Sequence, residues 1–308
     1  MCEMVKNRKS CAVKILKSKE DKLQKAIYFE NGIEKYYAVA FYVPEENECV
    51  ICVSSQIGCP EKCRFCATGD QAFVRNLTVE EIKDEIEIGL EMLDDMVEDT
   101  SDKRIAVIFE GMGEASYNID NCFGAYDEMY KCISDKYDKL ILRVSSSGNI
   151  KLCETYRSYF GKRHDVYCDV EFQVKLSVHT SFNEERKYIM PVVANKYEIA
   201  NIISHFQELA KEFGTKLICN YVLFEYPNGG NNYSVCHAQR LVEMIDKNYV
   251  HVTLGKYSET GKNFKSPEEK QYKLFYYYLM ILNDVETDIV TLYGNDINAA
   301  CGMLNYCE

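Results

Sequence analysis

Cys59–Cys66 (CPEKCRFC) places three cysteines in one short loop with the spacing C-x3-C-x2-C, shortly after the apolar run Val50–Val53. The thiolates of Cys59, Cys63 and Cys66 can hold three irons of a cubane iron–sulfur cluster. The fourth iron then lacks a protein ligand and can bind a small molecule, whereas a plain electron carrier uses four cysteines. The loop therefore predicts a cluster that carries out chemistry on a bound molecule.

Two other interpretations of this loop stay open, a structural zinc site and a set of buried free thiols. Zinc in a structural site takes four close ligands, and the next histidine in the chain is His164, far from Cys66. The cluster is the favoured interpretation on the loop alone.

The chain of 308 residues is long enough to bury a full core, as one α/β barrel-type domain or as two smaller domains. It contains no run of about 18 apolar residues that would cross a membrane. The first nine residues, MCEMVKNRK, lack the apolar segment of a secretory signal, which predicts a cytoplasmic protein. The 15 cysteines are odd in number, so reduced thiols are expected rather than a disulfide framework.

The formal net charge of the chain is −12. This argues against a broad nucleic-acid-binding surface, because contacts to phosphate need clustered lysine and arginine side chains. A local basic patch remains compatible with the composition. The charge therefore bears on the choice between a large RNA substrate and a small one.

The first 45 residues predict a β-rich extension. Residues 25–30 and 33–41 alternate as strands do, and they flank Asn31-Gly32, a strong signal for a two-residue hairpin turn. The rest of the chain, residues 46–308, is expected to form the core.

The core alternates apolar strands with amphipathic helices. Thr78 and Glu81 form a capping box that opens the first helix. The expected strands are residues 49–53, 105–109, 140–144, 172–176, 217–223 and 250–254, and the clearest later helices are residues 195–213, 232–247 and 267–283. Repeated β–α units imply a parallel sheet with crossover helices. The fold class is therefore α/β, a partial TIM-like (β/α)6 barrel with an N-terminal β-hairpin.

Active residues of such barrels lie in the loops that follow the strands. The cysteine loop follows the first strand, Gly111–Glu114 follows the second, and Ser145–Gly148 follows the third. All three loops are therefore expected at one end of the barrel.

Longer sequence motifs resemble those of a known family. The cysteine spacing, with Phe65 before the last cysteine, is typical of radical S-adenosylmethionine (SAM) enzymes. The chain further resembles the RlmN/Cfr family, radical SAM enzymes that methylate an adenine ring carbon in large-subunit ribosomal RNA and, in some members, in tRNA. The words that match lie between about residues 27 and 304: 52–59 (CVSSQIGC), 66–69 (CATG), 73–78 (FVRNLT), 111–118 (GMGEASYN), 176–180 (LSVHT), Asn183 with Arg186, 189–191 (IMP) and 294–302 (GNDINAACG).

The resemblance implies a [4Fe–4S] cluster, two SAM molecules per turnover and two more mechanistic cysteines. Cys301 matches the cysteine that is first methylated by SAM. A second SAM then yields a 5′-deoxyadenosyl radical, which takes hydrogen from the S-methyl group, and the resulting methylene radical adds to adenine. Cys52 matches the cysteine that attacks Cys301 sulfur and releases the product as a disulfide forms. The alternatives are a buried thiol near the chain end for Cys301 and core packing for Cys52.

The resemblance also implies the SAM-binding residues. Gly113 and Glu114 match the clamp on the amino group of the methionine moiety. The ribose and carboxylate contacts match the serines Ser145, Ser146, Ser147 and Ser177, and Thr253 stands where the family has a SAM-contacting asparagine. Arg186 and Lys175 are assigned to phosphate, to SAM or to solvent, and His179 to a structural hydrogen bond. A flavodoxin or ferredoxin as electron donor and a monomeric state are expected.

Several positions depart from the family pattern. About 25 residues precede the hairpin, where the family carries a helical domain of nearly a hundred residues that helps to hold RNA. The family's glutamate for proton removal is Val39 here, and Glu34 is one candidate to replace it. Tyr293 and Gly255–Ser258 also differ. Adenine in rRNA or tRNA is the expected acceptor. The alternatives are the same chemistry on a nucleoside, a small heteroaromatic compound or a peptide, and a non-methylating iron–sulfur sensor or RNA-binding protein.

Overall fold

The N-terminal β-hairpin is formed as predicted. The computed structural model describes residues 4–8, 11–100, 102–161, 167 and 169–304, so residues 1–3, 9 and 10 of the predicted extension lie outside it. Strands β3 (Leu23–Glu30) and β4 (Ile33–Val43) pair antiparallel. At their turn, Asn31 and Gly32 have φ values of 53° and 76°. This is the left-handed conformation that a tight two-residue hairpin turn requires.

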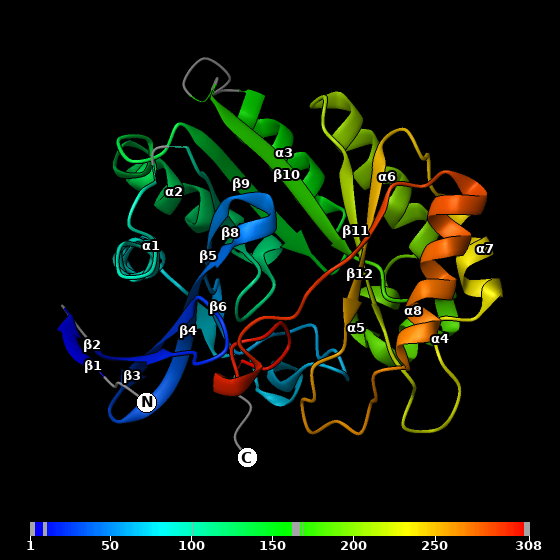
Figure 1. The fold of residues 1–308 in the computed structure, drawn as a ribbon, viewed down its shortest axis with the longest axis horizontal. Helices are drawn as coiled ribbons and strands as arrows, with labels where there is room; N and C mark the ends of the chain where they lie inside the picture. Colours follow the sequence, from blue (N-terminus) through cyan, green and yellow to red (C-terminus); the bar gives the residue numbers. More distant parts are fainter. Residues whose placement is uncertain (1–3, 9–10, 101, 162–166, 168, 305–308) are drawn as a thin grey trace.

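Two strands that were not predicted individually precede the hairpin. β1 (Met4–Arg8) and β2 (Cys11–Lys17) pair antiparallel with each other, and β2 pairs with β3. On its other side the hairpin joins the core, because β4 pairs antiparallel with β5 (Glu48–Cys52). The extension and the core therefore share one continuous sheet (Figure 1).

All six predicted core strands are confirmed. After β5 they are β8 (Arg104–Phe109), β9 (Lys139–Ser146), β10 (Val170–Ser177), β11 (Leu217–Leu223) and β12 (Val250–Lys256). Each pairs in parallel with the next, and a short seventh parallel strand, β13 (Thr287–Ile289), ends the sheet. The order β1 to β5 followed by β8 to β13 gives an eleven-stranded sheet. The predicted partial barrel with an N-terminal β extension is therefore confirmed.

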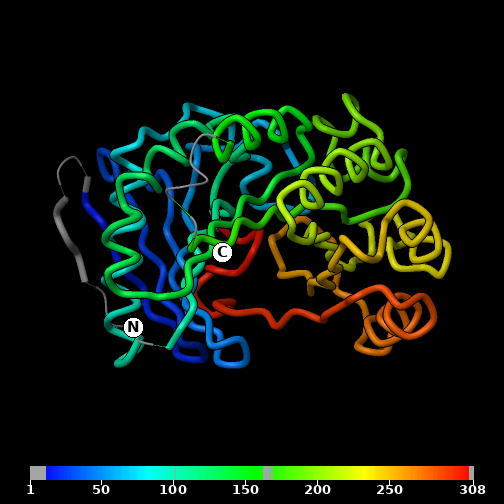
Figure 2. The backbone as a smooth tube through the Cα atoms, turned by 90° about the horizontal axis from the view of Figure 1, so that it is seen from above, coloured from blue at the N-terminus to red at the C-terminus, as the bar shows by residue number. Residues whose placement is uncertain are grey.

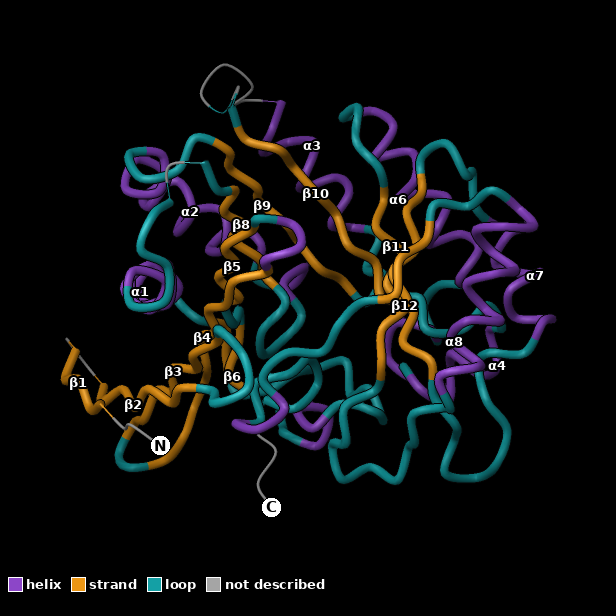
Figure 3. Tube along the Cα trace, in the orientation of Figure 1, coloured by secondary structure: helices purple, strands orange, loops and turns teal. Residues whose placement is uncertain are grey.

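The helices lie outside the curved sheet (Figure 3). The larger ones are α1 (Val79–Asp94), α2 (Ile119–Ser134), α3 (Lys151–Gly161), α6 (Ile199–Glu212), α7 (Val235–Met244) and α8 (Glu269–Tyr276), which continues as the π-helical segment η4 (Tyr277–Leu282). The short elements are η1 (Pro44–Glu46), β6 (Gln56–Ile57), η2 (Ala67–Asp70), β7 (Arg75–Asn76), η3 (Ala115–Tyr117), α4 (Asn183–Ile189), α5 (Pro191–Ala194) and η5 (Asn295–Ile297). Within the described part of the chain, no helix is long and apolar enough to cross a membrane.

Helix α1 packs directly on the first core strands. It contacts β4, β5 and α2, and Ile82, Ile86 and Leu93 on its inner face are completely buried. Gly89 permits this close approach, since a Cβ there would lie 2.4 Å from Ile51 Cγ2. The helix thereby fixes the strand that leads into the cysteine loop.

The C-terminal segment 294–304 returns to the hairpin. Ile297, Ala299 and Leu304 share a small apolar cluster with Leu23, Ile27, Tyr37, Val39 and Met112. Figure 2 shows this segment, in red, lying inside the arc that the helices form and beside the blue N-terminal strands. Segment 294–304 therefore packs against the N-terminal hairpin.

Substitution of the α1 cap tests this packing. Thr78 Oγ1 accepts from the Glu81 N–H, and the Glu81 carboxylate accepts from the Thr78 N–H, which forms the predicted capping box. Thr78→Ala should lower the free energy of unfolding by about 1 kcal/mol, because a helix N–H loses its acceptor. Denaturant titration under anaerobic conditions measures the change.

The control substitution is Ser204→Ala, at an exposed position of α6. It should change the free energy of unfolding by less than about 0.5 kcal/mol. An equal effect of the two substitutions would contradict a stabilising role for the cap.

Candidate functional site

The three cysteines of the loop lie close together. Cys59, Cys63 and Cys66 follow β6 and precede η2, and a charge on any one of them would disfavour charge on another. The pKa of each thiol is raised, chiefly because burial disfavours the thiolate. A bound metal can displace the protons of three such thiols, because it binds the thiolate form.

The loop also supplies hydrogen bonds to sulfur. The N–H groups of Thr68 and Gly69 donate to Cys66, and the Glu61 N–H donates to Cys59. Hydrogen bonds to the ligand sulfurs stabilise thiolates and adjust the potential of an iron–sulfur cluster. The donor set therefore suits a cluster.

The geometry bears on the zinc alternative as well. Within the described ranges, no three His, Cys, Asp or Glu side chains converge on the position of a single metal ion, and His164 lies outside those ranges. A mononuclear site needs that convergence. A cubane cluster does not, since each thiolate binds a different iron. The cluster thus fits the loop better than zinc does.

An aromatic group fastens the loop to the barrel. The Phe65 ring contacts His179 edge-on at 5.0 Å and stacks on Phe224 at 5.5 Å between ring centroids. His179 is buried, and its Nδ1 accepts from the Val222 N–H at 3.0 Å. Burial lowers the pKa of His179 to about 3, so it is a neutral acceptor. The prediction of a structural, hydrogen-bonded histidine is confirmed.

Glu114 is held next to the cluster loop by the predicted serines. Its carboxylate accepts from Ser146 Oγ at 2.7 Å and from the Ser147 N–H at 2.8 Å. Gly113 precedes it with φ of 104°, and a Cβ there would lie 2.7 Å from Gln56 Cβ. Glycine is therefore required for the turn that aims Glu114.

Several buried polar atoms around Glu114 lack a hydrogen-bond partner among the described residues. They are Ser145 Oγ, Ser147 Oγ and Glu61 Oε2, and the last two lie close enough to interact with each other. Glu61 is 1% exposed, and its pKa is raised by burial and by the nearby Glu114. Buried polar groups in proteins are nearly always paired, so a group of unpaired ones is expected where a polar ligand binds. The sequence did not single out Glu61.

Arg186 lies beneath this polar region. The assignment of Arg186 to solvent is wrong, because the side chain is completely buried. Its guanidinium donates to the carbonyl oxygens of Ser147, Ser177 and Val178. Burial lowers the pKa of Arg186 to about 10, which still leaves it charged at neutral pH. It ties the ends of β9 and β10 together and places positive charge near Cys63 and Glu114.

Ser177 and Thr253 lie on β10 and β12, the two strands that flank β11. Ser177 is half-buried at the end of β10. Thr253 Oγ1 on β12 donates to Asn220 Oδ1 on β11 at 3.3 Å, and the two residues are directly opposite in the strand register. Asn220 is a buried amide that the sequence analysis missed. Its position in the middle of an otherwise apolar strand is the signal that could have identified it.

Cys301 lies beside both the cluster loop and Cys52. Its thiol interacts with Cys66 and with Cys52 at the end of β5. Cys301 is open to solvent, yet the surrounding protein and the neighbouring Glu110 raise its pKa to about 12. The pKa of Cys52 is raised as well, first by burial and then by Glu110 and Cys301. The structure thus brings the five predicted cysteines together.

The C-terminal segment is fastened at both of its ends. The Ala67 N–H donates to the Gly302 carbonyl at 2.9 Å, and Thr68 Oγ1 donates to the Leu304 carbonyl at 3.1 Å. At the other end, Lys25 Nζ donates to the Asn298 carbonyl at 2.8 Å. The Gly294 N–H also donates to Asp21 Oδ2 at 2.7 Å, and Asp296 accepts from Ser18 Oγ and the Lys19 N–H at 2.8 Å each. These bonds fix Cys301 above the cluster loop.

An ion pair that the sequence did not predict faces Cys301. Lys175 Nζ on β10 lies 3.0 Å from both carboxylate oxygens of Glu110, which follows β8. Cys301 Sγ is 3.8 Å from Glu110 Oε1. Lys175, which the sequence assigned to solvent, phosphate or SAM, is thus paired with Glu110. Glu34, the candidate base, instead accepts from the Tyr37 hydroxyl at 3.0 Å.

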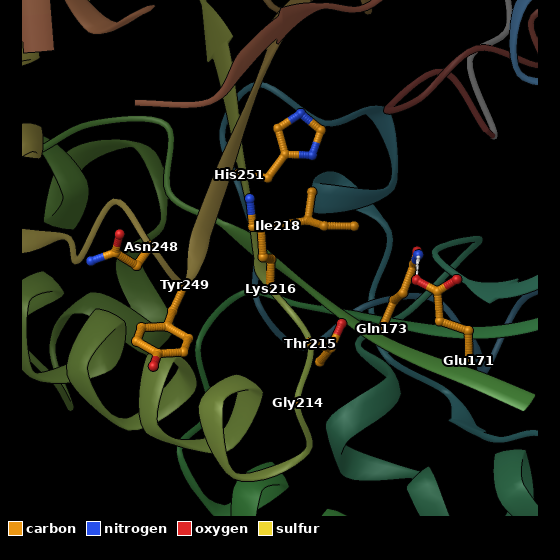
Figure 4. Close-up of a pocket in the computed structure, with 9 residues that line it drawn as sticks. All are labelled: Glu171, Gln173, Gly214, Thr215, Lys216, Ile218, Asn248, Tyr249 and His251. Carbon is orange, nitrogen blue, oxygen red and sulfur yellow. Dashed lines mark hydrogen bonds between the residues drawn. The ribbon is translucent and has the colours of Figure 1, made fainter. Parts of the chain in front are cut away.

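A separate open cavity of about 460 Å³ lies at the opposite end of the strands (Figure 4). Its lining comes from the starts of β10, β11 and β12 and from the turns before them, and includes Gln173, Lys216 and His251. No predicted site residue lines it. In barrels of this kind, function belongs to the other end.

The chain was compared with known proteins. No protein-family model matches it. It is similar to proteins described as "Probable dual-specificity RNA methyltransferase RlmN". The one from Prochlorococcus marinus (strain MIT 9515) is 29% identical over 264 residues, which is 85% of this chain and 70% of the relative. The one from Pseudothermotoga lettingae is 30% identical over 84% of this chain and 69% of the relative. The one from Thermotoga sp. (strain RQ2) is 31% identical over 82% and 67%.

A solved structure supports the fold. The crystal structure of a radical SAM methyltransferase from Sphaerobacter thermophilus superposes with a TM-score of 0.78 at 20% identity, over 98% of this chain and 80% of that one. At this identity the likeness shows the shared fold.

The raised pKa of Cys301 predicts its reactivity in the cluster-free protein. Alkylation by iodoacetamide requires the thiolate, so its rate should still be rising at pH 10, since the thiol titrates at about 12 rather than at the ordinary 9.0. Mass spectrometry of the Cys301 peptide measures the rate. In the same protein unfolded in urea, the rate should level off near the ordinary value. A plateau near pH 9 in the folded protein would contradict the raised pKa of the thiol.

Proposed function

The chain belongs to the RlmN/Cfr family of radical SAM methyltransferases, and we propose that it methylates a ring carbon of adenine in RNA through a methylated Cys301. The observation that carries the proposal is that the Cys301 thiol interacts electrostatically with both Cys52 and Cys66. This route needs the methyl carrier, the releasing thiol and the cluster loop near one another, and these interactions support that arrangement.

The cofactors follow from the family and from the fit of the residues. Cys59, Cys63 and Cys66 would hold a [4Fe–4S] cluster. Glu114 and Gly113 would take the amino group of SAM, while Ser145, Ser146, Ser177 and Thr253 would take its ribose and carboxylate. The unpaired Ser145 and Glu61 atoms support a polar ligand there. Together the cofactors supply the methyl group and a 5′-deoxyadenosyl radical.

The chain's own groups perform the remaining steps. Cys301 sulfur takes the methyl group as a thioether and presents it beside the cluster loop. Once the methylene carbon is bonded to the acceptor, the protein and its substrate are covalently joined. Cys52 thiolate then attacks Cys301 sulfur, so that an S–S bond forms as the S–CH2 bond breaks. Cys52 is half-buried at the end of β5, where it interacts with Cys301.

RNA is the proposed acceptor, because the curated relatives are described as RNA methyltransferases. The net charge of −12 favours a second candidate, the same chemistry on a nucleoside, a small heteroaromatic compound or a peptide. A non-methylating sensor would not need Cys52 and Cys301 to meet. A flavodoxin or ferredoxin as reductant, a monomeric state and a cytoplasmic location belong to the same proposal. We further propose that residues 1–45, the N-terminal extension, serve the 46–308 core by anchoring Cys301.

Mass spectrometry after anaerobic reconstitution with iron, sulfide and SAM tests the route. Cys301 should gain one methyl group, and Cys52→Ala should accumulate a covalent complex with an adenine-containing rRNA fragment, because nothing releases it. A denaturing gel detects this complex. Cys236→Ala, at an exposed position of α7, is the matched control and should release product normally. An unmethylated Cys301 in a protein with an intact cluster would overturn the proposal.

Salt dependence separates the two acceptor classes. Binding of an rRNA fragment should weaken steeply as salt rises, since phosphate contacts release counterions. The measurement is a binding titration at several salt concentrations. Absence of binding at low salt, together with a methylated Cys301, would favour the small acceptor.

A further inference from the structure

Glu110 touches both mechanistic sulfurs. Its main-chain N–H donates to Cys52 sulfur, and its carboxylate oxygen Oε1 lies 3.8 Å from Cys301 Sγ. The side chain is 15% exposed and is paired with Lys175, which is 21% exposed. An acid is therefore fixed at the place where the two thiols meet, largely shielded from water.

Methylation of an sp2 carbon requires a base close to Cys301 sulfur. The methyl group replaces a hydrogen, so that hydrogen must leave the carbon as a proton after the new C–C bond has formed. The acceptor carbon is then two bonds from Cys301 sulfur, through the methylene carbon. A group that contacts Cys301 Sγ is consequently within reach of the proton, and catalytic bases act over such hydrogen-bond distances.

We propose that the Glu110 carboxylate removes this proton and later returns it to the product methyl group. The proposal rests on the proposed methyl-cysteine route. Lys175 is a positioning residue, because its ammonium group holds both carboxylate oxygens at 3.0 Å. Glu110 is a catalytic residue, since it contacts the sulfur that bears the reacting carbon.

In the radical adduct, the acceptor carbon carries one hydrogen and the CH2 group on Cys301 sulfur. Glu110 takes the hydrogen as a proton, the C–H electron pair stays in the ring, and the unpaired electron passes to a one-electron acceptor of the iron–sulfur class. Cys52 thiolate then bonds to Cys301 sulfur, and the S–CH2 pair moves onto carbon. The protonated Glu110 returns its proton to that carbon, which gives the methyl group, a disulfide and the free carboxylate.

The other acids near the site are directed elsewhere. Glu34 accepts from Tyr37, and Glu114 from Ser146 and Ser147. Glu61 accepts from the Tyr117 hydroxyl at 2.8 Å. The fully buried Glu85 accepts from the Ser54 N–H at 3.1 Å behind β5. Among the described residues, Glu110 is the carboxylate with a contact to Cys301 Sγ.

The test compares the wild-type protein with Glu110→Gln and with the double variant Glu110→Gln/Lys175→Gln. The double variant removes both charges and leaves no unpaired ammonium group, which guards against misfolding. Reconstituted proteins react with SAM, a reductant and an adenine-containing rRNA fragment. Both variants should methylate Cys301 and form 5′-deoxyadenosine, but product should fall by about 100-fold or more, and the covalent complex should accumulate.

A readout without cofactors accompanies this assay. In the cluster-free protein, Glu110→Gln should speed alkylation of Cys301 at a fixed pH, because the carboxylate helps to raise the pKa of that thiol. Glu34→Gln is the matched control and should leave both product formation and alkylation at wild-type values.

The outcomes separate the two proposals. Wild-type product formation by both variants, with faster alkylation, overturns the role of Glu110 and leaves the proposed function standing. Loss of Cys301 methylation or of 5′-deoxyadenosine in the variants also overturns it, since a base for the later proton is not needed for those steps. An unmethylated Cys301 in the wild-type protein overturns the proposed function and the role of Glu110 with it.

Discussion

Cys301 can act only if the segment that carries it is held over the cluster loop, and hydrogen bonds at both ends of residues 294–304 provide that constraint. On one side the main chain of Ala67 is bonded to Gly302, and on the other Lys25 is bonded to Asn298. The small apolar cluster around Val39 and Met112 fills the space between. The N-terminal hairpin is therefore a structural support of the site, because without it half of these contacts would be lost.

The site gathers groups whose charged forms are unfavourable. Burial raises the pKa of the three loop thiols and of Cys52, and it lowers that of Arg186. Perturbed groups that gather in one place are typical of functional sites. Here the cost of burial is offset by pairing within the site, as in the Glu110–Lys175 ion pair, and by ligands that would replace the thiol protons.

Local signals in the sequence predicted most of the fold. Asn31-Gly32 specifies its hairpin, Thr78 and Glu81 specify a helix start, and apolar runs specify the six core strands. β13 was missed because three residues carry no periodic signal. The five cysteines were identified from their spacing and from the sequence motifs that match the family. The Glu110–Lys175 pair was not, because residues 65 positions apart become neighbours only when β8 and β10 are placed in the same sheet.

The strand order explains why an acid on either strand beside β5 could reach Cys52. At Cys52, the two neighbours of β5 are Val39 on β4 and Ile108 on β8. An acid can therefore approach the sulfur from either side. Val39 leaves the hairpin side apolar, and it packs in the cluster that carries Ile297 and Ala299. Glu110 follows β8 on the opposite side, where Lys175 can neutralise it. The flank of Cys52 that supports Cys301 is therefore apolar, and the flank where a proton must move carries an ion pair.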